Sequence, residues 1–279
     1  MSHNNQKKIA VINDFTGFGR CSISVCLPVI SAMKVQCCPL PTAVFSNHTG
    51  FESFFFRDCT DYMEDYAEEW KKLGLKFDGI MTGFLGSHRQ IEIVQRFFQE
   101  FHRDGCLALV DPVMGDYGKL YPTYSEALAA GMHDLVKYAD ILTPNLTEAC
   151  ILTGCEYRED MPQERLEEIA GQLTDMGPDR VVISGLSDGC DLLNYVYERD
   201  REPVLIREHK VGGFRSGTGD VFAAIIAADA VKGRSFAESV KRASGFIART
   251  LRRTMELDIP KTDGICFEEF LWELGAQEK

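Results

Sequence analysis

The sequence lacks several patterns that would place it in a common class. Its ten cysteines have no CxxC pair and no regular spacing, which argues against a zinc site and a disulfide framework. There is no GxxxxGKS/T loop, and the GFG at 17–19 lacks the third glycine of a dinucleotide motif, since Ser22 stands in its place. No signal peptide and no apolar run of membrane-spanning length is visible. These absences predict a cytoplasmic protein with reduced thiols.

Positive charge is also scarce. The 279 residues carry 30 Lys and Arg against 42 Asp and Glu, a net charge of −12. That balance argues against a dedicated nucleic-acid binder and against binding to an anionic membrane surface. A protein this acidic that handled phosphate would have to concentrate positive potential locally or take it from a metal ion.

Apolar strands and amphipathic helices alternate along the chain. We expect strands at 9–12, 35–45, 78–82, 107–110, 141–142 and 181–183, with an antiparallel pair at 192–197 and 204–206. We expect helices at 21–33, 61–73, about 91–101, 166–173, about 218–231 and 235–251. The alternation predicts an α/β fold with a mostly parallel sheet covered on both faces. No long linker or repeat is visible, so residues 1–279 are interpreted as one domain.

Polar residues follow five of the predicted strands. In open parallel sheets, ligands bind beyond the carboxyl ends of the strands. We therefore expect an active site where these ends converge, although each segment alone could be a turn. The segments are Asn13-Asp14, Gly83-Phe84, Asp111, Asn145 and Ser184-Gly185.

The most informative segment is GTGD at 217–220, which opens an apolar helix. Two glycines let the backbone approach a ligand, and the unpaired first-turn amides with the helix dipole suit a phosphate. A carboxylate in that turn would bind an anion poorly, so Asp220 is interpreted as a proton acceptor for an attacking alcohol. The alternative is that Thr218 or Asp220 merely caps the helix.

Three further segments allow two interpretations each. Asp111, in DPVMGD, could hold Mg²⁺ or form an ordinary turn. Asn145 and Glu148, in TPNLTE, could bind metal-bound water and phosphate, or form a capping box, or do both. The FSNHTG segment at 45–50 has the chemistry to line a pocket for a small aromatic ligand, although a lone histidine such as His48 is more often structural.

Together these motifs resemble the vitamin B6 branch of the ribokinase superfamily, the pyridoxal kinases. FSNHTG, TGFLGS at 82–87, DPVMGD, TPNLTE and GTGD occur in the family's order, and the similarity runs from about residue 8 to 253. The resemblance implies a three-layer α/β/α, ribokinase-like fold. It also implies ATP as donor, Mg²⁺ and often a monovalent cation such as K⁺, a homodimer, and phosphorylation of the 5-hydroxymethyl group of the B6 vitamers.

The resemblance also implies roles for individual residues. Asp220 is similar to the catalytic base, and Gly217, Thr218 and Gly219 to the anion hole. Thr218 and Gly219, together with Asn145 and Ser184, would contact ATP. Asp111 and Glu148 would organise the metal. The substrate would contact Asp14, Phe45, Thr49 and Phe84.

Two positions depart from the pattern. Asp14 stands where pyridoxal kinases have a serine that contacts the ring, and Phe84 stands where a tyrosine is common. Because hydroxymethylpyrimidine kinases, a sister branch, carry an aspartate at the position of Asp14, that activity is the first alternative. A sugar kinase of the same superfamily and an inactive ligand-binding regulator with the same fold are the others.

Overall fold

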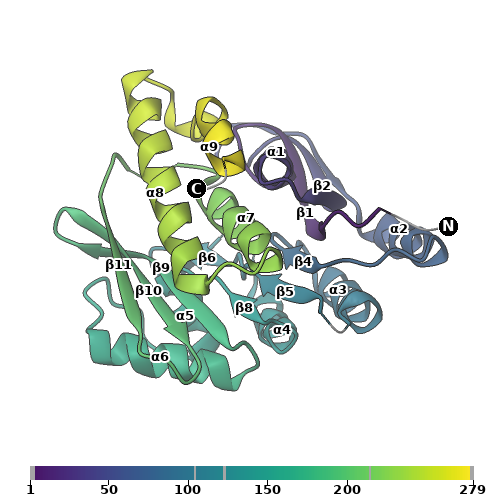
Figure 1. Cartoon of the computed structure of the whole chain (residues 1–279), viewed down its shortest axis with the longest axis horizontal. Coiled ribbons are helices and arrows are strands. Elements are labelled where there is room, and N and C mark those ends of the chain that lie inside the picture. The colour runs from purple at the N-terminus through teal and green to yellow at the C-terminus, as the bar shows by residue number, and fades with distance from the viewer. Residues whose placement is uncertain (1–3, 104, 122–123, 214, 277–279) are drawn as a thin grey trace.

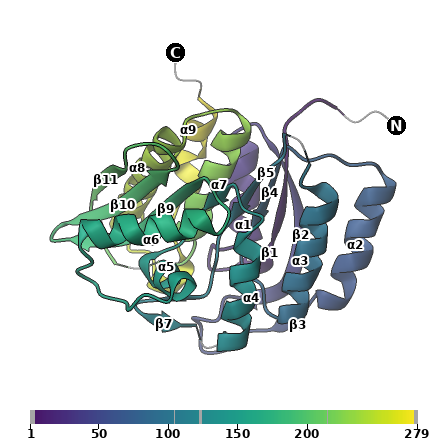
Figure 2. The same ribbon diagram turned by 90° about the horizontal axis from the view of Figure 1, so that it is seen from below.

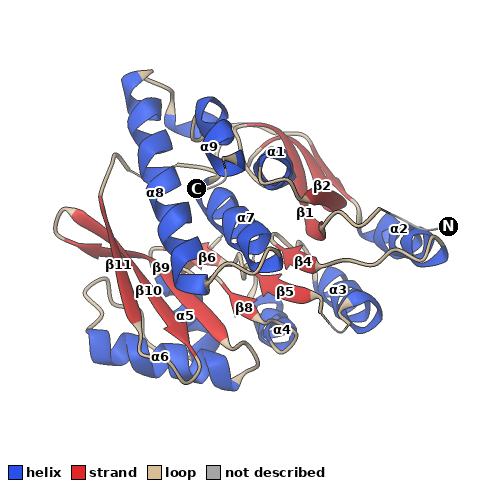
Figure 3. Ribbon diagram, in the orientation of Figure 1, coloured by secondary structure: helices blue, strands red, loops and turns tan. Residues whose placement is uncertain are grey.

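The structure, a computed structural model, describes residues 4–103, 105–121, 124–213 and 215–276. A nine-stranded sheet runs through these residues (Figures 1 and 3). In spatial order its strands are β11 (Val204–His209), β10 (Asp191–Glu198), β9 (Arg180–Asp188), β8 (Ile141–Leu142), β5 (Leu107–Val110), β4 (Gly79–Thr82), β1 (Lys8–Phe18), β2 (Gln36–Asn47) and β3 (Phe56–Asp58).

The six strands from β9 to β2 in this order pair in parallel, whereas β10, β11 and β3 are antiparallel to their neighbours. A separate small hairpin joins β6 (Gly115–Asp116) to β7 (Lys119–Leu120). The mostly parallel sheet and the antiparallel pair β10–β11 were both predicted, and both predictions are confirmed.

Helices cover both faces of the sheet (Figures 1 and 2). One face carries α1 (Ile23–Ala32), α7 (Thr218–Val231), α8 (Phe236–Glu256) and α9 (Leu271–Gly275). The other carries α2 (Thr60–Lys72), α3 (His88–Phe101), α4 (Glu126–Val136), α5 (Leu146–Thr153) and α6 (Gln163–Asp175). The predicted three-layer α/β/α architecture is therefore confirmed. Among the residues described, no helix combines the length and apolarity that crossing a membrane requires.

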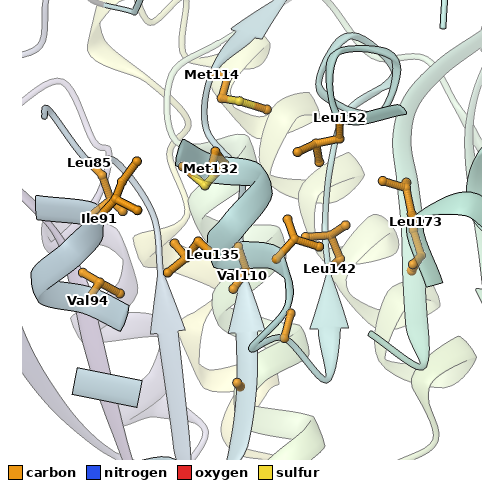
Figure 4. Close-up of a cluster of buried hydrophobic side chains, with 14 of the residues drawn as sticks. Leu85, Ile91, Val94, Val110, Met114, Met132, Leu135, Leu142, Leu152 and Leu173 are labelled. Carbon is orange, nitrogen blue, oxygen red and sulfur yellow. The ribbon is translucent and has the colours of Figure 1, made fainter. Parts of the chain in front are cut away.

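Each face has its own hydrophobic core, because successive side chains of a strand point to opposite sides. Along β1, Ile9 and Val11 belong to the core beneath α1, α7 and α8, whereas Ala10 and Ile12 belong to the other core. Cys37 and Cys38 likewise pack against opposite cores. Figure 4 shows part of the core under α3 and α4, including Ile91, Val94, Val110, Met132, Leu135 and Leu142. All ten cysteines are free, as expected.

The structure corrects two strand boundaries that bear on the site. β1 does not end at Ile12 but runs on to Phe18, and its pairing with β2 shifts register between Asn13 and Phe15. β9 likewise runs past Ser184 to Asp188. Asn13 and Ser184 thus lie within long strands rather than after them. Asn13 comes directly after Ile12, the last residue of β1 that pairs with β4.

Candidate active site

The GTGD segment forms the N-terminus of α7. Gly217 is the N-cap residue with φ +85°, and no side chain caps the helix. The first helical hydrogen bond runs from the N–H of Val221 to the carbonyl of Gly217, at 2.9 Å. The N–H groups of residues 218–220 therefore lie outside the helical pattern. The N-cap position is held by Gly217 rather than by Thr218 or Asp220, although the Asp220 carboxyl accepts from its own backbone N–H. The amides of residues 218 and 219 can face an anion.

Asp220 lies in this first turn and is half-buried. The side-chain amide of Asn13 donates to its Oδ1 over 3.2 Å, and the backbone N–H of Ser22 also donates to its carboxyl. Burial raises the pKa of Asp220 to about 6, and the charge of Asp14 adds to that increase. The donors on Ser22 and Asn13 and the backbone N–H of Asp220 itself oppose it. A carboxyl with this pKa is a better proton acceptor than an ordinary aspartate.

Asp14 is buried at the register shift in β1, with 5% of its surface exposed. Its two carboxylate oxygens accept from the hydroxyls of Thr16, at 2.6 Å, and Ser22, at 2.7 Å. Burial raises the pKa of Asp14, whereas these hydroxyls and the nearby His48 lower it. The carboxylate retains lone pairs for a further donor, because each of its oxygens can accept more than one hydrogen bond.

A second group of carboxyls lies beyond β5 and β8. Glu148 accepts from the backbone N–H of Met114 at 3.0 Å and of Asn145 at 2.9 Å, and the Asn145 side chain accepts from the N–H of Glu148 at 2.9 Å. The predicted capping box of α5 is therefore present. Asp111 accepts from the hydroxyl of Thr143 at 3.0 Å.

Asp111 and Glu148 are suited to a hard cation. Burial is the largest cause that raises the pKa of each, and at Asp111 the charges of Glu148 and Asp220 raise it further. Neighbouring buried carboxylates that raise one another's pKa are stabilised in the ionised form by a cation. Within the described part of the chain no group of three or more His, Cys, Asp or Glu has metal-binding geometry. Two carboxylates suffice for Mg²⁺, which usually keeps several waters and takes phosphate oxygens as ligands.

The predicted strand ends do converge. The backbone N–H of Phe84 donates to Asn13 Oδ1 over 2.9 Å, which joins the segment after β4 to β1. Asn145 forms a parallel bridge with Ser184, whose N–H donates to the carbonyl of Pro144 at 2.9 Å. The bridge joins the segment after β8 to β9.

Aromatic side chains gather where β2 meets the segment after β4. Phe45 of β2 is buried, and its ring centre lies 6.2 Å from that of Phe84 in an edge-on contact. Phe54 and Phe56 pack against Phe45 at 5.9 and 4.8 Å. Thr49, in contrast, is exposed in the turn after β2. Phe45 and Phe84 thus come together as an aromatic wall, and Thr49 is not enclosed with them.

The C-terminal strap, defined here as residues 259–268, packs against the loop between β1 and α1. His48 Nε2 lies 2.7 Å from the carbonyl of Thr262, while its Nδ1 accepts from the N–H of Gly50. Arg20 donates to the carbonyl of Asp263 and pairs with Glu268 at 2.6 Å. His48 therefore joins two segments of chain, in line with a structural role.

Sequence reasoning assigned no role to three residues that contact the carboxylates directly. Asn13 was named only as a strand-end residue, although an amide beside Asp14 was a usable signal. The contact of the Thr143 hydroxyl with Asp111 can be explained in hindsight, because Thr143 directly follows β8. The N–H of Ser22 gave no signal at all, since its contact with Asp220 depends on the folded course of the loop.

Comparison with known proteins supports the resemblance to pyridoxal kinases that the sequence motifs indicate. The family model for phosphomethylpyrimidine kinase matches residues 23–264. Bovine pyridoxal kinase is 32% identical over 206 residues, covering 66% of this chain and 64% of that protein. The chain therefore spans under two thirds of the length of this curated relative.

Solved structures extend the likeness over the whole chain. A Bacteroides thetaiotaomicron protein, provisionally described as a phosphomethylpyrimidine kinase, is 38% identical, with a TM-score of 0.97 over 100% of this chain and 97% of that one. A second crystal form of it contains pyridoxal, with a TM-score of 0.94 over 99% and 98% of the two chains and 37% identity. Pyridoxal kinase from Lactobacillus plantarum is 26% identical, with a TM-score of 0.89 over 96% of each chain. The predicted resemblance is confirmed, and the chain belongs to the phosphomethylpyrimidine kinase family.

Proposed function

We propose that this chain is an ATP-dependent kinase that phosphorylates the 5-hydroxymethyl group of pyridoxamine, pyridoxal and pyridoxine. The observation that carries the proposal is the placement of Asp220 at the uncapped N-terminus of α7. Unpaired amides for a phosphate and a carboxyl of raised pKa for a proton lie within the same turn. The pyridoxal in the similar Bacteroides structure supports the choice of substrate.

The substrate hydroxyl oxygen would attack the γ-phosphorus of ATP, the bond to the bridging oxygen of ADP would break, and Asp220 would take the hydroxyl proton. The amides of Gly217, Thr218 and Gly219 would stabilise the charge on the transferring group. Asn145 and Ser184 would contact ATP. Most of the rate acceleration would come from alignment and charge neutralisation.

Asp111 and Glu148 would hold Mg²⁺, which when bound neutralises charge on the phosphates. A monovalent cation such as K⁺ is proposed on the family resemblance alone. The carboxyl oxygens of the two residues offer the ligand type that Mg²⁺ prefers, and burial gives them a need for positive charge.

The flat ring of the substrate would pack against Phe45 and Phe84, with Thr49 at the edge of the pocket. Asp14 would pair with a protonated ring nitrogen or an aminomethyl cation of the substrate. A carboxylate about 4 Å from a cation gains about 4 kcal/mol before desolvation at an effective dielectric near 20. Pairing with the aminomethyl cation predicts a preference for pyridoxamine over pyridoxal.

Hydroxymethylpyrimidine phosphorylation is the second candidate function, favoured by Asp14 and by the matching family model. One assay separates the two: ATP consumption with pyridoxamine, pyridoxal, pyridoxine and hydroxymethylpyrimidine side by side. We expect the B6 vitamers to be turned over faster. Turnover of hydroxymethylpyrimidine alone would overturn the B6 assignment, and no turnover of any of them would favour an inactive regulator.

We further propose a single kinase domain that forms a cytoplasmic homodimer. Support for the dimer comes from exposed aromatic side chains, namely Phe15 and Phe18 of β1, Phe56 of β3 and Phe55 directly before β3. β3 is also an edge strand, and exposed edges favour pairing with another chain. Sedimentation of the wild type and of Phe55→Ser tests this, since a monomeric wild type would contradict it.

A further inference from the structure

One side chain joins the substrate side of the site to its proton acceptor. Asn13 is 2% exposed, and its Oδ1 accepts two backbone hydrogen bonds, from Asp14 and from Phe84, each of 2.9 Å. Its Nδ2 donates to Asp220 Oδ1. A single amide thus contacts β1, the segment after β4 and the first turn of α7.

The orientation of this amide is fixed by its partners. Two N–H donors face the amide oxygen, so the amide nitrogen must face the carboxylate, and the flipped arrangement would put donors against donors. Space is equally restrictive. A β-carbon added to Gly83 would lie 2.5 Å from both Cγ and Nδ2 of Asn13. The absence of a side chain at residue 83 therefore makes room for this amide.

The carboxylate of Asp220 is consequently held from two directions. Asn13 approaches from β1, and the N–H of Ser22 approaches from the residue before α1. A carboxylate has about four acceptor positions, so these two donors and the backbone N–H of Asp220 itself still leave a position for a substrate hydroxyl. The same amide also holds the backbone of Phe84, whose ring forms the aromatic wall with Phe45.

We propose that Asn13 is a positioning residue that fixes the carboxylate of Asp220 relative to the substrate wall at Phe84. The proposal rests on the proposed kinase function for its effect on turnover. The hydrogen bond from the Asn13 amide to the Asp220 carboxylate can be tested without measuring turnover. Misplacement of a reacting group by about 1 Å costs on the order of 100-fold in rate. Substitution of the side chain that sets the position of the Asp220 carboxylate should therefore lower the rate.

Other titratable groups also act on Asp220, and a test must distinguish their effects from that of Asn13. Asp14 raises its pKa through its charge, while Cys21, Cys26, Asp111 and Tyr121 each interact electrostatically with it. Asn13→Ser removes the amide donor without adding a charge to this group. Serine is too short to bridge to Asp220, yet its hydroxyl can still serve one of the backbone N–H groups.

The experiment measures the pKa of Asp220 by carbon-13 NMR of aspartate-labelled protein, with the signal assigned through Asp220→Asn, and in parallel the pH profile of kcat/KM. For Asn13→Ser we expect the pKa and the acidic limb of the profile to rise together, by about one unit. We also expect kcat to fall about tenfold or more, with little change in KM for ATP. Gly83→Ala, which displaces the unaltered Asn13, should raise the pKa of Asp220 and the acidic limb of the pH profile in the same way.

Thr42→Val is the matched control. The Thr42 hydroxyl donates to the carbonyl of Phe84 over 3.0 Å, so its loss loosens the same segment without touching Asp220. An equal shift in this control, or no shift in both Asn13→Ser and Gly83→Ala, would overturn the proposal. The NMR measurement stays decisive if the wild type proves inactive on every substrate, so failure of the proposed function and failure of this inference remain distinguishable.

Discussion

The carbonyl oxygen of Arg20 occupies the space that a side chain on residue 217 would need: a β-carbon added to Gly217 would lie 2.1 Å from it. Gly217 also has φ +85°, a conformation that other residues rarely adopt. The start of α7 and the loop before α1 can therefore meet only at a glycine.

Gly217→Ala should accordingly lower the free energy of unfolding by about 1 to 3 kcal/mol, through backbone strain and the clash with Arg20. Gly219→Ala is the control, because nothing lies within 4 Å of its added β-carbon. Alanine in the helix should leave stability unchanged or raise it slightly. Urea denaturation measures both, and equal losses in the two variants would contradict the account.

Asp220→Asn should reduce turnover at least about 100-fold, as expected for loss of a general base, while ATP binding is retained. The wild-type rate should fall as the pH drops below about 6, where Asp220 becomes protonated. Steady-state kinetics across pH, with nucleotide titration, measures both effects. Near-normal turnover of the variant would remove Asp220 from the role of base.

The same variant should be more stable than the wild type at neutral pH. The pKa of Asp220 is raised from 3.8 to about 6 in the folded chain, so folding favours the protonated form. The stability that this proton contributes is present below about pH 4 and is lost as the pH rises through about 6. The advantage of Asp220→Asn, on the order of 1 to 3 kcal/mol, should therefore grow over that window. Denaturation of both proteins at about pH 4 and about pH 8 measures this advantage. A difference in the free energy of unfolding that is the same at both pH values would exclude a raised pKa for Asp220.

Asp14→Ser should erode the preference for pyridoxamine over pyridoxal, measured as the ratio of the two kcat/KM values. Asp14→Asn keeps the shape of the side chain and removes only its charge, so it should lower that ratio too. A ratio that stays unchanged in both variants would refute pairing between Asp14 and the aminomethyl cation of the substrate.

Glu148→Gln should weaken both the fold and the use of Mg²⁺. Both oxygens of Glu148 accept backbone N–H groups, and an amide can accept with only one. The resulting unsatisfied donor should cost about 1 to 3 kcal/mol, and the Mg²⁺ concentration needed for half-maximal rate should rise. Asp116→Asn, a nearby carboxyl with no assigned role, is the control. Unaltered Mg²⁺ dependence in Glu148→Gln would exclude the proposed ligand.

The sequence predicted most of the elements because their apolar periodicity is strong. The stripe of Ile91, Val94, Phe98 and Phe101 lies on the buried face of α3, as expected. The helix α4 was not predicted, since Gly131 interrupts its pattern. In the structure a β-carbon there would lie 2.9 Å from Ile91 Cδ1, so Gly131 permits close packing of α4 on α3. Such a reason is visible only once the helices are packed.

The site shows the same division between what sequence reveals and what it does not. Asp111, Asn145, Glu148 and Asp220 were named as candidates because acidic and amide residues directly after strands, or at the start of helices, are informative. The continuation of β1 beyond Asn13 was missed, because asparagine, aspartate and glycine usually indicate turns. Pairing with the long β2 overrides that local preference.

The C-terminal strap has a consequence for the order in which the enzyme becomes complete. Arg20 and His48, near the start of the chain, are held by Asp263, Glu268 and Thr262, near its end. A nascent chain that had reached only α8 would contain every strand and every carboxylate of the site. It would still lack the strap that holds Arg20 and His48, so we expect phosphoryl transfer to begin only after residues 259–268 have left the ribosome.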